Sequence, residues 1–67
     1  MLQEVKGRQR WRHVEGAEYE VIVVTNTHAT RPEGAWAPQV VYQDQLGRVW
    51  SRPLSEWHNR FHFIEEF

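Results

Sequence analysis

The strongest constraint on the fold comes from residues 19–25, whose sequence is YEVIVVT. Consecutive β-branched residues favour extended backbone, because their side chains pack well on a pleated surface. Apolar groups fall on both faces of such a strand, so we expect it to occupy the middle of a sheet. The run therefore predicts a mostly β fold.

The length of the chain limits how such a sheet can be stabilised. The chain has 67 residues and no cysteine. So short a chain buries only about 60% of the surface that its unfolded form exposes, and without cysteine neither a disulfide nor a thiolate zinc site can hold the fold. The core must therefore be rich in aromatic residues, and we expect a single domain that is a monomer or a homodimer.

Four further strands follow from alternation and turn residues. In residues 10–14 the alternation places Trp11 and His13 on the inner face, and the turn at Gly16 leads into the next strand. Residues 39–43, 48–52 and 61–64 also read as strands, and residues 44–47 as a turn. Residues 53–58 begin with proline and are too short for a stable helix, which predicts one helical or 3₁₀ turn. Residues 26–38 lack any sustained period and predict a long loop.

Five short strands with a helical turn before the last one predict a small five-stranded SH3-like barrel. We expect residues 1–9 to form a flexible N-terminal arm and residues 10–67 the domain itself. The structural alternative is an open meander that packs on a partner chain or pairs its edge strand with a second copy.

Charge and targeting signals narrow the class of protein. The formal net charge is -1, which argues against a dedicated duplex-DNA binder. The basic residues near the N-terminus read either as a solvated strand face or as a local anion site; they are Lys6, Arg8, Arg10 and Arg12. No signal peptide or membrane span is recognisable, so we expect a cytoplasmic protein without membrane contact.

The sequence offers little for catalysis. Cysteine is absent, and Ser51 and Ser55 lack the glycine elbow of a serine nucleophile. Histidines 13, 28, 58 and 62 lack a carboxylate in register as a third ligand, so we expect no metal and no cofactor. His13 stands apart, because an imidazole on the inner face needs a hydrogen-bond partner. We therefore predict a binding module and not an enzyme, and an enzyme that acts on a nucleotide derivative is the less favoured alternative.

Two surfaces are candidates for binding. One combines the exposed Trp36 of the long loop with Arg12, Tyr42 and Arg52, and would bind a protein partner, since Trp and Arg dominate binding hot spots. The other is the face shared by Trp50 and Arg52, where a nucleotide or single-stranded nucleic acid would stack on the indole and place a phosphate on the guanidinium. The structural alternative is that Trp50 belongs to the core and Arg52 caps a neighbouring group.

Three blocks stand in order along the chain, WRHVEGAEYEV at residues 11–21, VVY at residues 40–42 and WSRPL at residues 50–54, and Trp57 follows them. Together they resemble a family of small bacterial and phage domains of unknown function, DUF1653. The pattern of that family is approximately Y-R-H-x-K-G-x-x-Y-x-V, then V-V-Y, then W-x-R-P-L followed by an aromatic residue, which Trp57 matches. Trp11 replaces the usual tyrosine and Glu15 the usual lysine, and residues 27–38 differ from the shorter segment usual there.

The resemblance implies a compact β domain without an assigned activity. Because some relatives accompany nucleotide-hydrolysing nudix domains, it implies nucleotide-related ligands. Because phages carry similar proteins, it also implies a host protein as partner.

Overall fold

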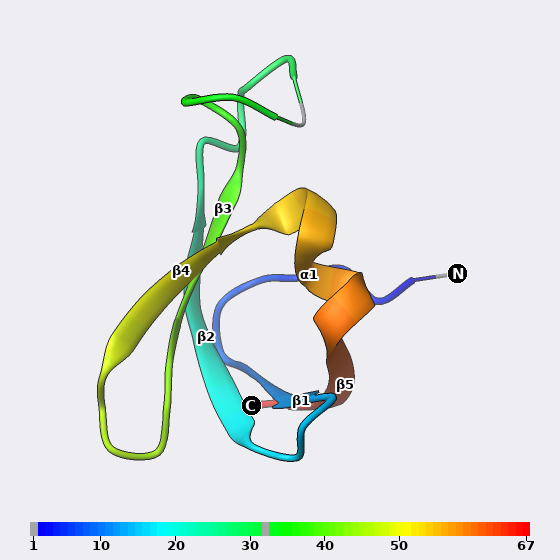
Figure 1. The fold of residues 1–67 in the computed structure, drawn as a ribbon, viewed down its shortest axis with the longest axis vertical. Helices are drawn as coiled ribbons and strands as arrows, with labels where there is room; N and C mark the ends of the chain where they lie inside the picture. The colour runs from blue at the N-terminus through cyan, green and yellow to red at the C-terminus, as the bar shows by residue number, and fades with distance from the viewer. Residues whose placement is uncertain (1, 32) are drawn as a thin grey trace.

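The computed structural model describes residues 2–31 and 33–67, in which five antiparallel strands form one sheet in the order β4-β3-β2-β1-β5 (Figure 1). A helix lies between the last two strands. The elements are β1 Gln9–His13, β2 Glu18–Thr25, β3 Gln39–Gln43, β4 Val49–Pro53, α1 Leu54–Arg60 and β5 Phe61–Glu66.

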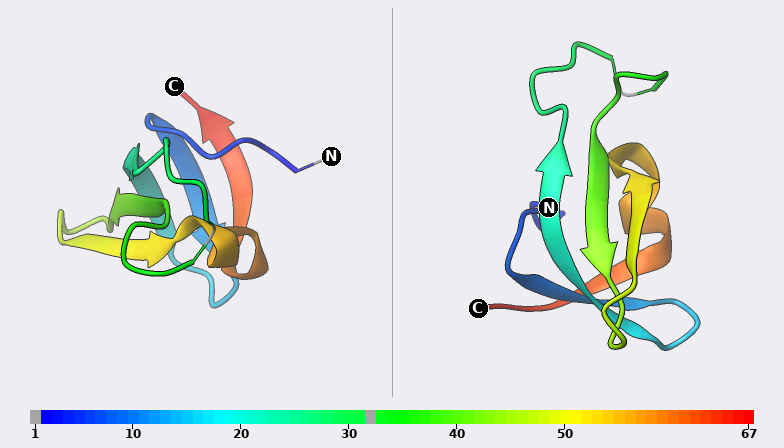
Figure 2. Two further views of the ribbon diagram at one scale, coloured as in Figure 1. Left: turned by 90° about the horizontal axis from the view of Figure 1, so that it is seen from above. Right: turned by 90° about the vertical axis from the view of Figure 1, so that its left-hand side faces the viewer.

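The predicted fold class is confirmed, with one qualification about closure. β2 lies in the middle of the sheet, as its apolar sequence predicts, and the helix precedes the last strand. The sheet curls strongly, but β4 and β5 stay at its two edges and do not pair. The barrel is therefore open, and α1 bridges the gap between the edge strands (Figures 1 and 2).

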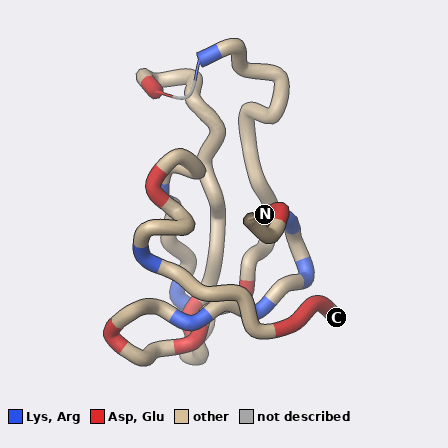
Figure 3. Tube along the Cα trace, turned by 90° about the vertical axis from the view of Figure 1, so that its right-hand side faces the viewer, with Lys and Arg blue, Asp and Glu red and all other residues tan. Residues whose placement is uncertain are grey.

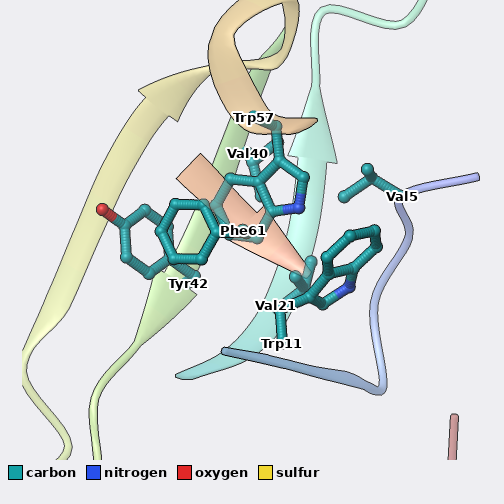
Figure 4. Close-up of a cluster of buried hydrophobic side chains, with 7 residues drawn as sticks. All are labelled: Val5, Trp11, Val21, Val40, Tyr42, Trp57 and Phe61. Carbon is teal, nitrogen blue, oxygen red and sulfur yellow. The ribbon is translucent and has the colours of Figure 1, made fainter. Parts of the chain in front are cut away.

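The core lies on the concave face of the curled sheet and consists mainly of aromatic side chains (Figure 4). Trp57 of α1 stacks on Phe61, with ring centroids 3.8 Å apart and planes inclined by 9°. Trp11 packs edge-on against Trp57 at 5.7 Å. Offset and edge-on aromatic pairs contribute about 0.5–1.5 kcal/mol each beyond the area they bury, which explains how so short a chain holds together without cross-links.

The helix is longer than the single turn predicted from the sequence. α1 spans seven residues, although so short a segment is not stable as an isolated helix and no side chain caps its N-terminus. Tertiary packing stabilises the additional residues of the helix, because Trp57 at its centre is fully buried. β5 also runs two residues beyond the predicted end at Ile64. Of its phenylalanines, Phe61 is buried in the core and Phe63 remains 37% exposed.

The N-terminal segment contributes to the packed domain beyond the boundary expected at Arg10. Val5 belongs to the core cluster, and Gln9, the first residue of β1, is fully buried. Met1, within the expected arm, and Pro32, within the expected loop, lie outside the described residues. The rest of the predicted loop has no helix or strand, and no helix in the described ranges has the length and apolar character needed to cross a membrane.

Candidate functional site

Phe61 is the centre of a cluster of side chains on the concave face, which we call the Phe61 cluster (His13, Tyr19, Tyr42, Arg52 and Phe61, with Trp50 at its edge opposite Tyr42). α1 ends where Phe61 begins β5, so the helix fixes the position of this ring. Three rings contact Phe61 edge-on, at centroid distances of 5.0 Å for His13, 5.7 Å for Tyr19 and 5.5 Å for Tyr42. Side chains from β1, β2 and β3 therefore meet at one point.

Arg52 contributes a cation to this cluster. It lies opposite Val40 in the ladder between β3 and β4, and its guanidinium carbon is 5.7 Å from the centroid of Phe61. The side chain is half-buried, and its Nε is buried without a hydrogen-bond partner. Within the described ranges no acidic side chain forms an ion pair with Arg52. A buried N–H donor that has no hydrogen-bond partner costs free energy of folding.

Trp50 lies beside Arg52 on the same face of β4, as the two-residue spacing predicts. It pairs with Tyr42 across the β3–β4 ladder, and half of its surface is exposed. Its indole N–H donates to Oδ2 of Asp44 at 3.3 Å. The ring is therefore both held in place at one end and accessible to a ligand.

Asp44 organises the turn that holds Trp50. Burial by itself raises the pKa of this carboxyl, but hydrogen bonds from Arg48, Trp50 and the backbone N–H of Leu46 together lower it to about 2. The closest contact joins Nε of Arg48 to Oδ2 at 2.7 Å. Asp44 is thus ionised at any physiological pH and fixes the ring of Trp50 through a charge-assisted hydrogen bond.

His13 has the hydrogen-bond partner that an inner-face imidazole needs. Its Nδ1 accepts the backbone N–H of Glu15 at 3.1 Å. Since Nδ1 is an acceptor, the proton of the neutral ring resides on Nε2. The ring also packs edge-on against Tyr19 at 6.4 Å.

Two of the six residues predicted from the sequence lie away from this cluster. Arg12 is on the opposite face of β1, where Nη2 contacts Glu18 at 2.8 Å. Trp36 is 81% exposed in the loop that extends beyond the sheet (Figure 1). The fold brings together His13, Tyr42, Trp50 and Arg52, and adds Tyr19 and Phe61, which the sequence analysis did not single out.

Three of the four basic residues near the N-terminus, Lys6, Arg10 and Arg12, have acidic partners, and Nε of Arg8 donates to the backbone oxygen of Phe67 at 3.0 Å. Lys6 contacts Glu66 at 3.7 Å, and Arg10 contacts Glu65 at 2.6 Å. Acidic and basic residues alternate in this part of the molecule (Figure 3). The arrangement agrees with a solvated, charge-balanced strand face. The described residues also contain no group of three His, Asp or Glu side chains placed to hold a metal ion.

The comparisons with known proteins identify a family but no ligand. A search of curated proteins found no match, and neither did a search of solved structures. A family model described as "Protein of unknown function (DUF1653)" matches residues 9–64. The match begins at the first residue of β1 and extends into β5, so it covers nearly the whole sheet and includes the Phe61 cluster. The chain therefore belongs to the DUF1653 family, as its sequence blocks predict.

Proposed function

We propose that the protein is a binding module that recognises a nucleotide at the Phe61 cluster. The base stacks on the accessible ring of Trp50, and the phosphate binds the guanidinium of Arg52. Stacking on an aromatic ring contributes about 1–3 kcal/mol per base, and a hydrogen bond to a charged group about 1.5–3 kcal/mol. Together the two contacts contribute about 2.5–6 kcal/mol before the cost of association is subtracted, so the expected complex is weak and tolerates different bases.

The observation that supports this proposal is the lack of an acidic partner for Arg52. Arg10, Arg12 and Arg48 each have a carboxylate within 2.8 Å. Arg52 has none among the described residues. Arg60 also lacks one, but Arg60 is exposed, whereas Arg52 is half-buried, has a buried Nε without a hydrogen-bond partner and lies against the ring of Phe61. A planar guanidinium of this kind matches the geometry of a phosphate, which accepts two parallel hydrogen bonds.

A small ligand fits this face better than a nucleic-acid strand. A strand requires several cations along its path, whereas the cluster supplies one unpaired guanidinium. Glu18 and Asp44 line the surface next to Tyr19, and their charges would repel further phosphates. The overall charge of -1 also disfavours a polyanion.

Tryptophan fluorescence tests the proposal directly. In a Trp36→Phe background the remaining exposed indole is that of Trp50, because Trp11 and Trp57 are at most 1% exposed. Titration with adenosine monophosphate should quench this signal, and adenosine without phosphate should bind at least about tenfold more weakly, as expected for loss of a charged hydrogen bond. Absence of quenching by adenosine, guanosine, cytidine and uridine monophosphates at millimolar concentration would rule the proposal out.

The exposure of Trp36 supports a second candidate, a protein contact made by the loop of residues 26–38. An indole that is 81% exposed is an unusual feature for a monomeric surface and a frequent anchor at interfaces. Trp36→Ala should leave the unfolding midpoint unchanged and abolish capture of the partner from cell lysate. Equal capture by both proteins would argue against this loop.

A further inference from the structure

β2 extends beyond β1, the strand that pairs with one of its two edges. β1 pairs with β2 from Glu18 to Val21, and β3 pairs with the other side as far as Thr25. The residues between Val21 and Thr25 therefore have β3 on one side and no strand on the other within the described ranges. Figure 2 (right) shows this part of β2 above the point where the N-terminal segment reaches the strand.

The N-terminal segment covers the first part of this open edge and then turns away. Arg8 N–H donates to the carbonyl of Val21 at 3.0 Å. Gly7 passes so close to β2 that a Cβ on it would lie 2.5 Å from the carbonyl oxygen of Ile22. From there the chain places Val5 in the core. Residues 23–25 are left as an exposed strand edge, about 10 Å long at the usual rise per residue.

An apolar groove runs along the same edge. Its volume is about 620 Å³, within the range of ligand-binding sites. Its apolar lining comes from the N-terminal segment, from β2 and from the start of α1, and includes Val5, Ile22, Val23, Val24 and Leu54. A β-bulge at Ile22 shapes it, because the irregular register lets both Val21 and Val24 face the core while Ile22 and Val23 remain 42% and 46% exposed.

The wall of the groove is fixed by specific contacts. Nε2 of His58 lies 2.8 Å from the carbonyl oxygen of Gln3, which ties the N-terminal segment to α1. The backbone N–H of Lys6 donates to the buried amide oxygen of Gln9 at 3.0 Å. The groove is thus bounded by anchored backbone on the side opposite β2.

We propose that this groove binds an extended peptide segment of a partner protein, which adds to β2 as a strand beside residues 23–25. The backbone edge selects an extended chain, since a helix has no free backbone groups with which to continue the ladder. The apolar lining selects apolar side chains at alternate positions, which point into the groove. Glu4 and Lys6 line the groove, and Lys6 is already paired with Glu66, so the charge of Glu4 disfavours an acidic peptide. This site is separate from the Phe61 cluster and does not depend on the proposed nucleotide binding.

A displayed library of random decapeptides, selected on the full chain, tests the proposal. The selected peptides should share alternating apolar residues, and in a ¹⁵N-labelled sample the best of them should shift the amide signals of Val23, Val24 and Thr25 most strongly. N-methylation of alternate peptide amides should weaken binding at least tenfold, because it removes backbone donors while keeping every side chain.

Two matched variants locate the site. Val23→Glu places a charge in the groove and should reduce peptide affinity at least tenfold, whereas Val49→Glu, at an exposed residue of β4 that does not line the groove, should leave it unchanged. Circular dichroism establishes that both variants fold, and the N-methylated peptide provides the same test on the unmodified protein. The proposal is overturned if no peptide is enriched, if N-methylation has no effect, or if the amide shifts centre on Trp36 or Trp50.

Discussion

The indole N–H of Trp11 donates to the amide oxygen of Gln9 at 3.0 Å, and both side chains are buried. The same oxygen accepts the backbone N–H of Lys6, and the amide nitrogen donates to the carbonyl oxygen of Glu4 and to Glu66 Oε1. All four hydrogen-bonding positions of the Gln9 amide are thus occupied. This single side chain connects the N-terminal segment, β1 and the end of β5.

Replacement of Gln9 by Ala should destabilise the protein by about 2–3 kcal/mol, because it leaves buried donors and acceptors without partners. Urea unfolding followed by tryptophan fluorescence measures the change. Gln45→Ala, at an exposed position in the β3–β4 turn, is the control and should stay within about 0.5 kcal/mol of the original protein. Equal stability of the two variants would show that the network around Gln9 contributes nothing.

The two buried tryptophans offer a test of the same hydrogen bond by comparison. Trp11 Nε1 has a partner in Gln9, whereas Trp57 Nε1 is buried with none. Trp11→Phe and Trp57→Phe remove similar apolar volume, but only the first breaks a hydrogen bond. We expect Trp11→Phe to cost about 1 kcal/mol more in free energy of unfolding, and the opposite order would contradict the description of the core.

Gly7 is required for close approach of the N-terminal segment to β2. Gly7→Ala would bring a Cβ within 2.5 Å of the Ile22 carbonyl oxygen, which is backbone and cannot rotate away. The segment must then shift, and we expect a loss of about 1–3 kcal/mol, typical of overpacking. Glu4→Ala, at an exposed side chain of the same segment, should be neutral in the same urea titration.

Acid should release Trp50 from Asp44. The pKa of Asp44 is lowered to about 2 from an ordinary value of 3.8, so its ionised form stabilises the folded state. That contribution is complete above pH 3.8 and disappears as the pH falls through about 2. The chemical shift of the Trp50 indole N–H should therefore titrate in this window, and in Asp44→Asn the titration should be absent. A shift that persists in Asp44→Asn would assign the effect to another group.

Much of the fold follows from local sequence, and the exceptions have tertiary causes. The β-branched run of β2 specifies a central strand, and the apolar residues Val40, Val41 and Tyr42 specify a further strand. The full length of α1 does not follow from its own sequence, because burial of Trp57 against Phe61 stabilises it from outside. The burial of Gln9 could not be predicted from the sequence either, since a polar residue before the first predicted strand gives no sign that four hydrogen-bond partners will surround it.

The candidate site was predictable only within single strands. Alternation correctly placed Trp50 with Arg52, and Trp11 with His13, on shared faces. Alternation does not state how the sheet curls, so it could not separate Arg12 from Tyr42 or bring Tyr19 to Phe61. The open edge of β2 also could not be predicted from the sequence, because the number of β2 residues that pair with β1 depends on where Gly7 lets the chain turn away.

The claim that Arg52 holds an anion beside Trp50 is tested most directly by comparing two arginine variants. Arg52→Gln and Arg60→Gln remove the same charge, and within the described ranges neither arginine has an ion pair, but Arg60 is exposed on α1 and outside the Phe61 cluster. In an adenosine monophosphate titration followed by the indole N–H signal of Trp50, Arg52→Gln should weaken binding at least tenfold and Arg60→Gln less than twofold. Equal affinities for the two variants would contradict the account.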